Sequence, residues 1–459
     1  MTAPDAGLSW GGIARLGLVQ AMLGAVVVLT TSTLNRVMVV ELALPALLPG
    51  LLVALHHAVQ LSRPRMGFGS DLGSRRTPWI VGGMLVLATG GWLGAMATAW
   101  MAARPQAGLA LAVVAFALVG LGVSAAGTAL LTLLAKRVQA TRRAAAAATV
   151  WVMMIVGFAV TAGVAGQLLD PFTPQRLVAV SGSVSLIAFV VTVIALWRLE
   201  GDGRSLEVHA ARDDTGMTLV RFRAALSEVW HEPDARRFTV FVFVSMVAYS
   251  AQDLILEPFA GVMFGYSPGE STQLASVQHG GTLAGMLLAA LAGRRIAGIG
   301  FGSLRTWTVW GCLASCAALA GLAYAGLQTP ANWPLRANVF LMGVANGAFS
   351  IAAIGAMMAL AGQGRQGREG TRMGLWGAAQ AIGFAMGGVA GTAASDLARW
   401  LLGAPGPAYA SVFAIEAVLF VMSAWLARRI AVPAGVTGGD ALPVLAGDAA
   451  AGVALEKRT

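Results

Sequence analysis

The stretch WVMMIVGFAVTAGVAGQLLD at residues 151–170 recurs, in altered form, as WGAAQAIGFAMGGVAGTAASD at residues 376–396. Both copies begin with tryptophan, contain Gly-Phe-Ala and Gly-Val-Ala-Gly in the same order, and end with an aspartate, Asp170 in one and Asp396 in the other. Equivalent residues are 225 or 226 positions apart, which is close to half of the 459-residue chain. The sequence therefore predicts two homologous halves.

Each copy belongs to a longer apolar stretch, and such stretches recur along the whole chain. An α-helix needs about 20 apolar residues to cross the hydrocarbon core of a bilayer. Twelve stretches come close to that length or exceed it, six on each side of a charged segment, at 14–38, 43–66, 79–101, 107–134, 144–169, 177–198, 238–264, 272–293, 304–327, 335–361, 373–397 and 408–430.

This pattern predicts an all-α polytopic membrane protein with twelve transmembrane helices in two six-helix halves. Internal duplication of this kind describes the major facilitator fold. The predicted parts are an N-terminal half at 1–198, a central loop at 199–237, a C-terminal half at 238–430 and a tail at 431–459.

Composition agrees with a membrane protein. Hydrophobic residues make up 57% of the chain and charged residues only 11%, against about 25% charged in soluble domains. So few charged side chains cannot cover a water-facing surface, which excludes soluble and disordered classes. Continuous apolar runs also exclude a β-barrel, whose strands alternate apolar and polar residues. Cys312 and Cys316 are the only cysteines and are expected to be small packing residues of one span.

The distribution of Lys and Arg predicts the orientation of the spans, because cytoplasmic loops carry the excess of basic residues. Twenty-six fall on the side of both termini and the central loop, and five on the other side. Both termini are therefore expected in the cytoplasm. The same asymmetry accounts for the net charge of +10 without nucleic acid as a partner, because the charged segment from Arg198 to Arg237 carries eight acids beside its seven arginines.

The loop between the second and third spans reads GFGSDLGSRR and contains Gly67, Gly69, Asp71, Gly73, Arg75 and Arg76. It resembles the signature of that loop in major facilitator proteins, in which glycines allow close helix approach and the Asp and Arg side chains lock neighbouring helices. Leu72 stands where the signature has a basic residue, which favours a role other than gated transport. The Gly-x-Gly-x-x-Gly pattern at 362–367 follows a membrane span rather than a strand, so no nucleotide is expected.

Three histidines lie within spans, where ionisable side chains are rare and mostly functional. His56 and His57 fall in the middle of the second span, and His279 in the eighth. A neutral imidazole can serve as the axial ligand of a chlorin magnesium, or it can hydrogen-bond to a neighbouring helix, and both interpretations stay open. The pair ranks first because its apolar surroundings make an unpaired imidazole costly. His279 lies beside Gly280 and Gly281, which would admit a flat ring. No other metal site and no catalytic residue is expected.

A second polar group combines Asn35, Arg36 and Glu41 at the end of the first span with Asp253 and Glu257 of the seventh. Asp253 and Glu257 are one helical turn apart and so share a helix face. We expect this group to pair internally. It is interpreted either as a proton or substrate site, or as a structural or docking cluster, and the second interpretation is preferred.

Small residues repeat at four-residue spacing in two spans, as Gly383, Gly387 and Gly391 and as Gly281, Gly285 and Ala289. Such faces allow helix backbones to approach closely. Internal helix packing is therefore the predicted role, although a flat ligand or a foreign helix would also fit a smooth face.

Three blocks, TLNRVMVVEL at 33–42, LSRPRMGFGSDLGSRRTPWI at 61–80 and AQDLILEPFAG at 251–261, resemble one family more closely than the superfamily. They resemble the PucC/LhaA proteins of purple phototrophic bacteria, the bacteriochlorophyll delivery family, over about residues 12–430. Phe259-Ala260 stands where that family would have Tyr-Gly.

The resemblance implies an assembly factor for light-harvesting antennae (LH1 or LH2) in the bacterial inner, intracytoplasmic membrane. It implies bacteriochlorophyll as the ligand, with carotenoid as a further candidate, and antenna α/β polypeptides as partners beside pigment-synthesis enzymes and membrane lipids. It implies no enzymatic activity. The alternatives are a proton-coupled secondary transporter of a small molecule or pigment precursor, and a membrane enzyme of pigment synthesis.

Overall fold

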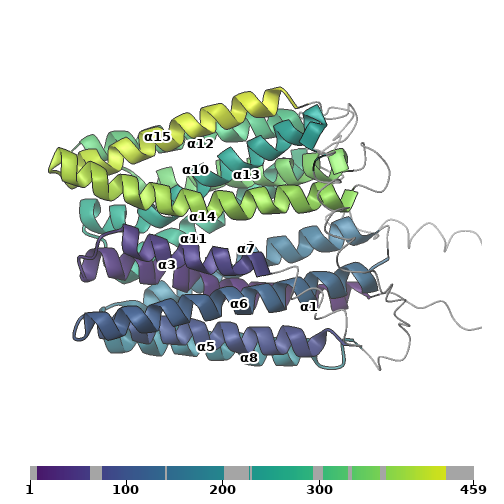
Figure 1. The fold of residues 1–459 in the computed structure, drawn as a ribbon, viewed down its shortest axis with the longest axis horizontal. Helices are drawn as coiled ribbons and strands as arrows, with labels where there is room; N and C mark the ends of the chain where they lie inside the picture. The colour runs from purple at the N-terminus through teal and green to yellow at the C-terminus, as the bar shows by residue number, and fades with distance from the viewer. Residues whose placement is uncertain are drawn as a thin grey trace, which may run out of the picture.

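The computed structural model describes residues 8–62, 75–139, 142–200, 227, 230–292, 303–328, 333–361 and 369–430. Within these residues, twelve helical segments follow the order of the twelve predicted spans, and no strand is formed (Figure 1). The first segment consists of α1 (Trp10–Val28), η1 (Leu29–Thr33), α2 (Leu34–Arg36) and η2 (Val37–Glu41), and the second of α3 (Leu47–Val59) and η3 (Gln60–Ser62).

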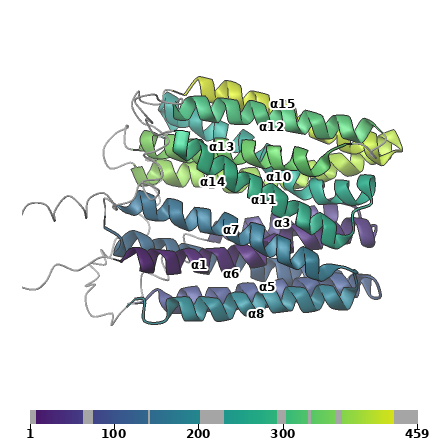
Figure 2. The same cartoon turned by 180° about the vertical axis from the view of Figure 1, so that it is seen from behind.

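The other ten segments are single helices, and they run side by side along the long axis of the molecule (Figures 1 and 2). They are α5 (Thr77–Met101), α6 (Pro105–Arg137), α7 (Arg143–Leu169), α8 (Pro174–Leu196), α10 (Pro233–Phe264), α11 (Pro268–Ala292), α12 (Leu304–Leu327), α13 (Leu335–Ala361), α14 (Glu369–Leu402) and α15 (Pro405–Arg428). Ten of the twelve segments are long and apolar enough to cross a membrane; α3 with η3 is shorter, and α14 falls outside those ten. The predicted fold class is confirmed.

The second helix begins later than predicted. Its apolar sequence extends back to residue 43, but Ala43 has a φ of 51° and Pro45 follows it. An L-amino acid in the left-handed region of backbone conformation cannot be part of a right-handed α-helix. The helix therefore starts after Ala43, at Leu47. The seventh helix begins earlier than predicted, at Pro233 rather than near 238, with proline in its first turn, where the missing N–H costs nothing.

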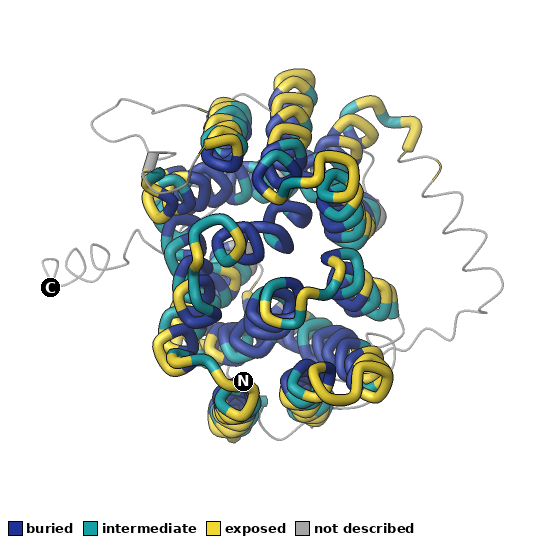
Figure 3. Tube along the Cα trace, turned by 90° about the vertical axis from the view of Figure 1, so that its left-hand side faces the viewer, coloured by how far each residue is buried: buried dark blue, intermediate teal, exposed yellow. Residues whose placement is uncertain are grey.

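Each half has its own apolar core. One core joins α1, α5, α6 and α8, and the other joins α10, α12, α13 and α15. Edge-to-face aromatic contacts in the second core connect α15 with α10 and with α13. We name the end at which α1 begins and α15 ends the inner end, and the opposite end the outer end. Viewed from the outer end, buried positions lie toward the middle of the bundle and exposed positions on its rim (Figure 3).

The glycine faces predicted for internal packing are confirmed in that role. A Cβ atom at Gly387 would lie 2.3 Å from the Val247 carbonyl oxygen of α10, and one at Gly285 only 2.0 Å from the Val344 carbonyl oxygen of α13. A Cβ atom at Gly281 would likewise lie 2.3 Å from the Phe340 carbonyl oxygen of α13. These faces are therefore filled by neighbouring helix backbones and leave no room for a flat ligand at Gly281.

Two alanine substitutions on α14 test this packing. Gly387→Ala should destabilise the protein, because overpacking a tight helix contact costs about 1–3 kcal/mol. Gly377→Ala is the matched control, since no atom lies within 4 Å of its Cβ position and alanine favours helix by about 1 kcal/mol. Thermal unfolding in detergent should show a lower midpoint for the first variant only. Equal midpoints would contradict the assigned contact.

Candidate functional site

Helices α7 and α11 form one of two seams that join the halves. At the outer end, a Cβ atom at Gly166 would lie 2.7 Å from the Gly269 carbonyl oxygen, so the backbones touch. Further in, the Ser276 hydroxyl donates a hydrogen bond of 2.7 Å to the Ala159 carbonyl. Toward the inner end, apolar residues of α7, including Ile155, pack with Met286 and neighbouring residues of α11. This seam, called the α7–α11 seam below, is packed along most of its length.

Helices α3 and α14 form the second seam. Both carboxylate oxygens of Asp396 accept backbone N–H groups at the start of α3, from Ala46 at 3.0 Å and Leu47 at 2.8 Å. Gly50 faces Thr392 below this contact, and the His57 ring lies 5.4 Å from the Phe384 ring still further in.

The two aspartates that end the repeated stretches have equivalent positions in these seams. Asp170 of the N-terminal half accepts a hydrogen bond of 2.9 Å from the Ser267 hydroxyl, directly before α11 of the other half. Asp396 of the C-terminal half contacts the first turn of α3. A negative charge at a helix N-terminus is favourable because of the unpaired N–H groups there. The duplication thus produces one acidic contact at the outer end of each seam.

A buried polar group joins the first segment to α10 and to the loop that follows it. The Asn35 amide donates to the Leu254 carbonyl at 2.6 Å, and the Arg36 guanidinium donates to the Tyr266 carbonyl at 2.6 Å. Arg36 also pairs with Glu41 at 2.5 Å, and the Ser32 hydroxyl donates to Glu257. Ser32 belongs to η1, Asn35 and Arg36 to α2, and Glu41 to η2. Two π-helical segments, which are frequent at functional positions, thus flank the central pair.

This group agrees with the expected pairing of Asn35, Arg36 and Glu41, but the seventh helix contributes differently than its sequence suggests. Glu257 contacts Ser32 across the interface between the halves. Asp253 instead accepts a hydrogen bond of 2.9 Å from the Gln278 amide of α11, within the C-terminal half. The two acids share a helix face but hold different partners.

The three intramembrane histidines differ in their surroundings. The Gln60 amide nitrogen lies 2.8 Å from Nε2 of His56 and 3.4 Å from Nδ1 of His57, so it can donate to either ring. The His279 ring, 8% exposed, packs 5.0 Å from the Phe158 ring, and no hydrogen bond joins it to the described residues. Within the described residues, a buried ring nitrogen of His279 therefore has no hydrogen-bond partner. His56 and His57, which the sequence interpretation placed first as pigment ligands, both lie within hydrogen-bond distance of the Gln60 amide.

The loop signature is only partly described, because Gly67, Gly69, Asp71 and Gly73 lie outside the described residues. Arg75 and Arg76 lie directly before α5. The Arg76 backbone N–H donates to Glu200 at 2.6 Å, and the Thr77 N–H and hydroxyl donate to the same carboxylate at 2.8 and 2.7 Å. Glu200 therefore caps α5 at the inner end of the N-terminal half.

Three polar residues of the C-terminal half were missed by the sequence interpretation. Glu416, Gln252 and Asn346 are fully buried, and each has side-chain atoms without a hydrogen-bond partner. Glu416 was detectable, since it is the one acid in the last predicted span. Carboxylates within membrane spans are rare and mostly functional, and this holds for Glu416 as much as for Asp253.

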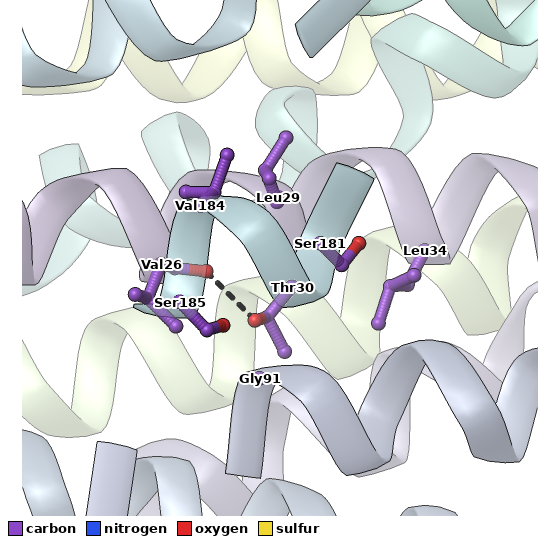
Figure 4. A pocket seen from close by; sticks show the side chains of 8 residues that line it. All are labelled: Val26, Leu29, Thr30, Leu34, Gly91, Ser181, Val184 and Ser185. Atoms are coloured by element: carbon purple, nitrogen blue, oxygen red, sulfur yellow. Dashed lines mark hydrogen bonds between the residues drawn. The ribbon is translucent and has the colours of Figure 1, made fainter. Parts of the chain in front are cut away.

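Two small cavities are lined by described residues, and each lies within one half. The first, of about 190 Å³, lies between the first segment, α5 and α8 and is lined by Val26, Leu29, Thr30, Leu34, Gly91, Ser181, Val184 and Ser185 (Figure 4). The second, of about 230 Å³, lies at the inner end of the C-terminal half. Neither leaves room for more than about one water molecule, so neither can hold a ligand.

Comparison with solved structures defines the class of protein. The fold is that of the major facilitator-type transporters. It matches a mutant of the nucleoside transporter NupG with a TM-score of 0.66 and 13% identity, over 91% of this chain and 99% of that one. It also matches a bacterial homologue of the human lysosomal transporter Spinster in an inward-facing, occupied conformation, with a TM-score of 0.63 and 16% identity, over 91% and 95%.

Comparison with sequences defines the family. The profile described as "PUCC protein" matches residues 33–435, and the chain belongs to this family. It is 50% identical to the "Bacteriochlorophyll synthase 44.5 kDa chain" of Rhodobacter capsulatus, over 93% of this chain and 97% of the relative. It is 31% identical to "Protein PucC" of Cereibacter sphaeroides, over 88% of each chain.

Removing the Asp396 carboxylate tests the outer seam contact. Asp396→Ala leaves two N–H groups of α3 without their acceptor, and loss of a helix cap costs about 1 kcal/mol. We expect a lower unfolding midpoint in detergent. Asp234→Ala is the control, because Asp234 is a half-exposed acid at the start of α10 that contacts only its neighbour Arg237, at 3.5 Å. An equal loss in both variants would count against a specific role of Asp396.

Proposed function

We propose that the protein is an assembly factor for light-harvesting antennae that holds bacteriochlorophyll and delivers it to antenna α/β polypeptides. The observation that carries this proposal is membership of the PucC family, together with 50% identity to a relative named for bacteriochlorophyll. The protein acts without catalysing a reaction, although that relative's name contains the word synthase. It resides in the inner, intracytoplasmic membrane with both termini in the cytoplasm, as the basic residues of its loops favour.

His279 is the residue that would hold the magnesium of the pigment. Its uncharged imidazole has a lone pair to offer, and a buried ring nitrogen without a hydrogen-bond partner is costly unless a ligand uses it. Phe158 lies against the ring and offers an aromatic surface. Gly280 has no atom within 4 Å of its Cβ position, so the backbone next to His279 is accessible. These residues fit a flat, magnesium-containing ligand, with carotenoid as a second candidate for the neighbouring apolar surface.

The α7–α11 seam gives this site a route to the membrane. Gly280 lies on the same face of α11 as Gln273 and Ser276, which contact Gly166 and Gly163 of α7. On α7, Val156, Val160 and Val164 near this seam are exposed. This seam is packed in the structure, so we infer that α7 and α11 separate locally to let pigment enter and leave sideways, toward the lipid phase in which antenna helices lie.

The polar group of Asn35, Arg36, Glu41 and Glu257 holds the halves together beside this route. The bonds from Ser32, Asn35 and Arg36 to Glu257, Leu254 and Tyr266 cross the interface and orient the first segment against α10, whereas the Arg36–Glu41 pair lies within the first segment. Asp253 orients α11 through Gln278, one residue before His279. In this role the acids position the site and do not carry protons through the protein.

Substitution of His279 tests the pigment site. Near-infrared absorption of the purified protein should show bound bacteriochlorophyll, and His279→Leu should lower pigment per folded protein about tenfold, as loss of a metal-site contact commonly does. His57→Leu is the matched control, because it removes an intramembrane imidazole of the other seam. Gly280→Leu, which fills the open side, should act like His279→Leu. Full pigment in both folded α11 variants would show that this site is not used.

The alternative function is proton-coupled secondary transport, which the transporter fold and the buried acids Asp253 and Glu257 favour. Asp253→Asn and Glu257→Gln keep the side-chain shape and remove the charge. Under our proposal both variants lower antenna absorption in cells in proportion to the loss of folded protein. Uptake of a porphyrin precursor by proteoliposomes under a pH gradient is the second measurement. A variant that keeps full antenna assembly but abolishes saturable uptake would establish transport instead.

A further inference from the structure

The carboxylate of Glu416 in α15 is buried in the interior of the C-terminal half. Its residue is 1% exposed, and neither carboxylate oxygen accepts a hydrogen bond from the described residues. A lone carboxylate in an apolar interior is among the most costly groups to bury, and within a membrane such groups usually have a functional partner. Glu416 therefore requires a positive partner that no described side chain supplies.

The helix register defines what Glu416 faces. It shares a helix face with Tyr409, Phe413 and Phe420. Phe259 of α10 contacts Phe413 with ring centroids 5.0 Å apart, and Phe349 of α13 contacts Phe420 at 5.7 Å. Glu416 lies between these two contacts along α15. The helix register therefore directs its side chain toward α10 and α13, whose rings contact the same face of α15.

Asn346 of α13 lies at nearly the same depth as Glu416. Asn346 lies three residues before Phe349 on α13, and Glu416 lies four residues before Phe420 on α15. Because these two rings are in contact and α13 and α15 run in the same direction, the helix rise places Asn346 and Glu416 within about 1.5 Å of the same depth. Asn346 is 0% exposed; its amide oxygen accepts a hydrogen bond of 2.8 Å from Ser315 of α12, and its amide nitrogen has no partner.

Gln252 of α10 completes the surroundings. It lies two turns before Phe259 on the same face, which places it within about 6 Å of the level of Glu416. It is 0% exposed, and neither its oxygen nor its nitrogen has a hydrogen-bond partner. A side chain that is both buried and unsatisfied at each end is rare in folded proteins. Four helices thus direct oxygen-bearing side chains to one region around a single carboxylate.

We propose that Glu416, Gln252, Asn346 and Ser315 form a binding site for a small monovalent cation, either a sodium ion or a proton. The ligands are all oxygen atoms, which hard cations prefer. One buried negative charge is neutralised by one positive charge, so the site favours a monovalent ion. Asp253 lies within electrostatic range but already accepts the Gln278 amide. The helices packed there also carry the titratable side chains of Tyr249 and Glu257 on α10, Cys312 and Cys316 on α12, and Tyr409 on α15, besides charged residues near the helix ends.

The N-terminal half indicates that the fold itself does not need this carboxylate. Ser185 stands at the same position after Pro174, the first residue of α8, as Glu416 does after Pro405, the first residue of α15. Around Ser185 lie the hydroxyl groups of Thr30 and Ser181 among apolar residues of the first segment, α5 and α8 (Figure 4). One half thus carries hydroxyl groups where the other carries an acid with amides. The cation site is a property of the C-terminal half and is separate from the pigment site.

The test uses the purified full-length protein in detergent, with thermal unfolding measured in sodium chloride and in choline chloride at equal ionic strength and pH. If a sodium ion occupies the site, sodium raises the unfolding midpoint of the wild type, in the way that any ligand of the native state does. Glu416→Gln should abolish this response. Glu270→Gln is the matched control, because Glu270 is an exposed acid at the start of α11, and it should respond like the wild type.

Infrared spectroscopy distinguishes the proton. If a proton occupies the site, sodium has no effect, but the carbonyl band of a protonated carboxylic acid is present in the wild type and in Glu270→Gln and is missing in Glu416→Gln. Gln252→Met, which keeps the volume and removes the amide, provides a second variant should Glu416→Gln not fold. It should weaken the sodium response about tenfold or shift the carbonyl band. No sodium response and no band change in either site variant would overturn the proposal.

Discussion

Backbone contact between α7 and α11 is the constraint on which the rest of this structure depends. Lipid is as apolar as the helices themselves, so helices in a membrane associate by close packing and by interhelical hydrogen bonds rather than by the hydrophobic effect. Gly166 and Gly269 let the two backbones touch, and Ser276 adds a hydrogen bond to the Ala159 carbonyl. The repeated sequence places a related contact between α3 and α14. The halves are therefore joined along two seams, each with an aspartate at its outer end.

This arrangement bears directly on function. Transporters of this fold bind substrates near the middle of the membrane at the interface of the repeats. Here the first segment and α10 meet in that interface through Ser32, Asn35 and Arg36, and the cavities found among the described residues belong to single halves. A pigment with a large apolar surface is already soluble in lipid and needs no aqueous path. A transporter fold with closed seams and an imidazole beside one of them suits a protein that holds such a molecule and passes it sideways.

The sequence was sufficient for the features that depend on composition and repetition. Apolar length located the twelve segments, and four-residue spacing identified Gly387 and Gly285 as packing positions, because both signals are local. The start of α3 was not predictable, since it depends on the left-handed backbone of Ala43. The histidine ranking rested on apolar neighbours in the sequence, whereas Gln60, one turn after His56, is what the ring contacts. Glu416 could have been singled out as the one acid of the last predicted span, but its lack of a hydrogen-bond partner among the described residues depends on the packing of other helices.

The most direct test of the account is a reversible lock on the α7–α11 seam. A Cβ atom at Gly163 would lie 3.6 Å from the Ser276 Cβ, a separation that a disulfide accepts. Gly163→Cys and Ser276→Cys are combined in a chain that carries Cys312→Ser and Cys316→Ser, and transfer of bacteriochlorophyll to antenna polypeptides is measured in membranes before and after oxidation. The account predicts that oxidation stops transfer in the double variant, that reduction restores it, and that neither single variant responds. Equal transfer by the oxidised and reduced double variant would contradict lateral delivery through this seam.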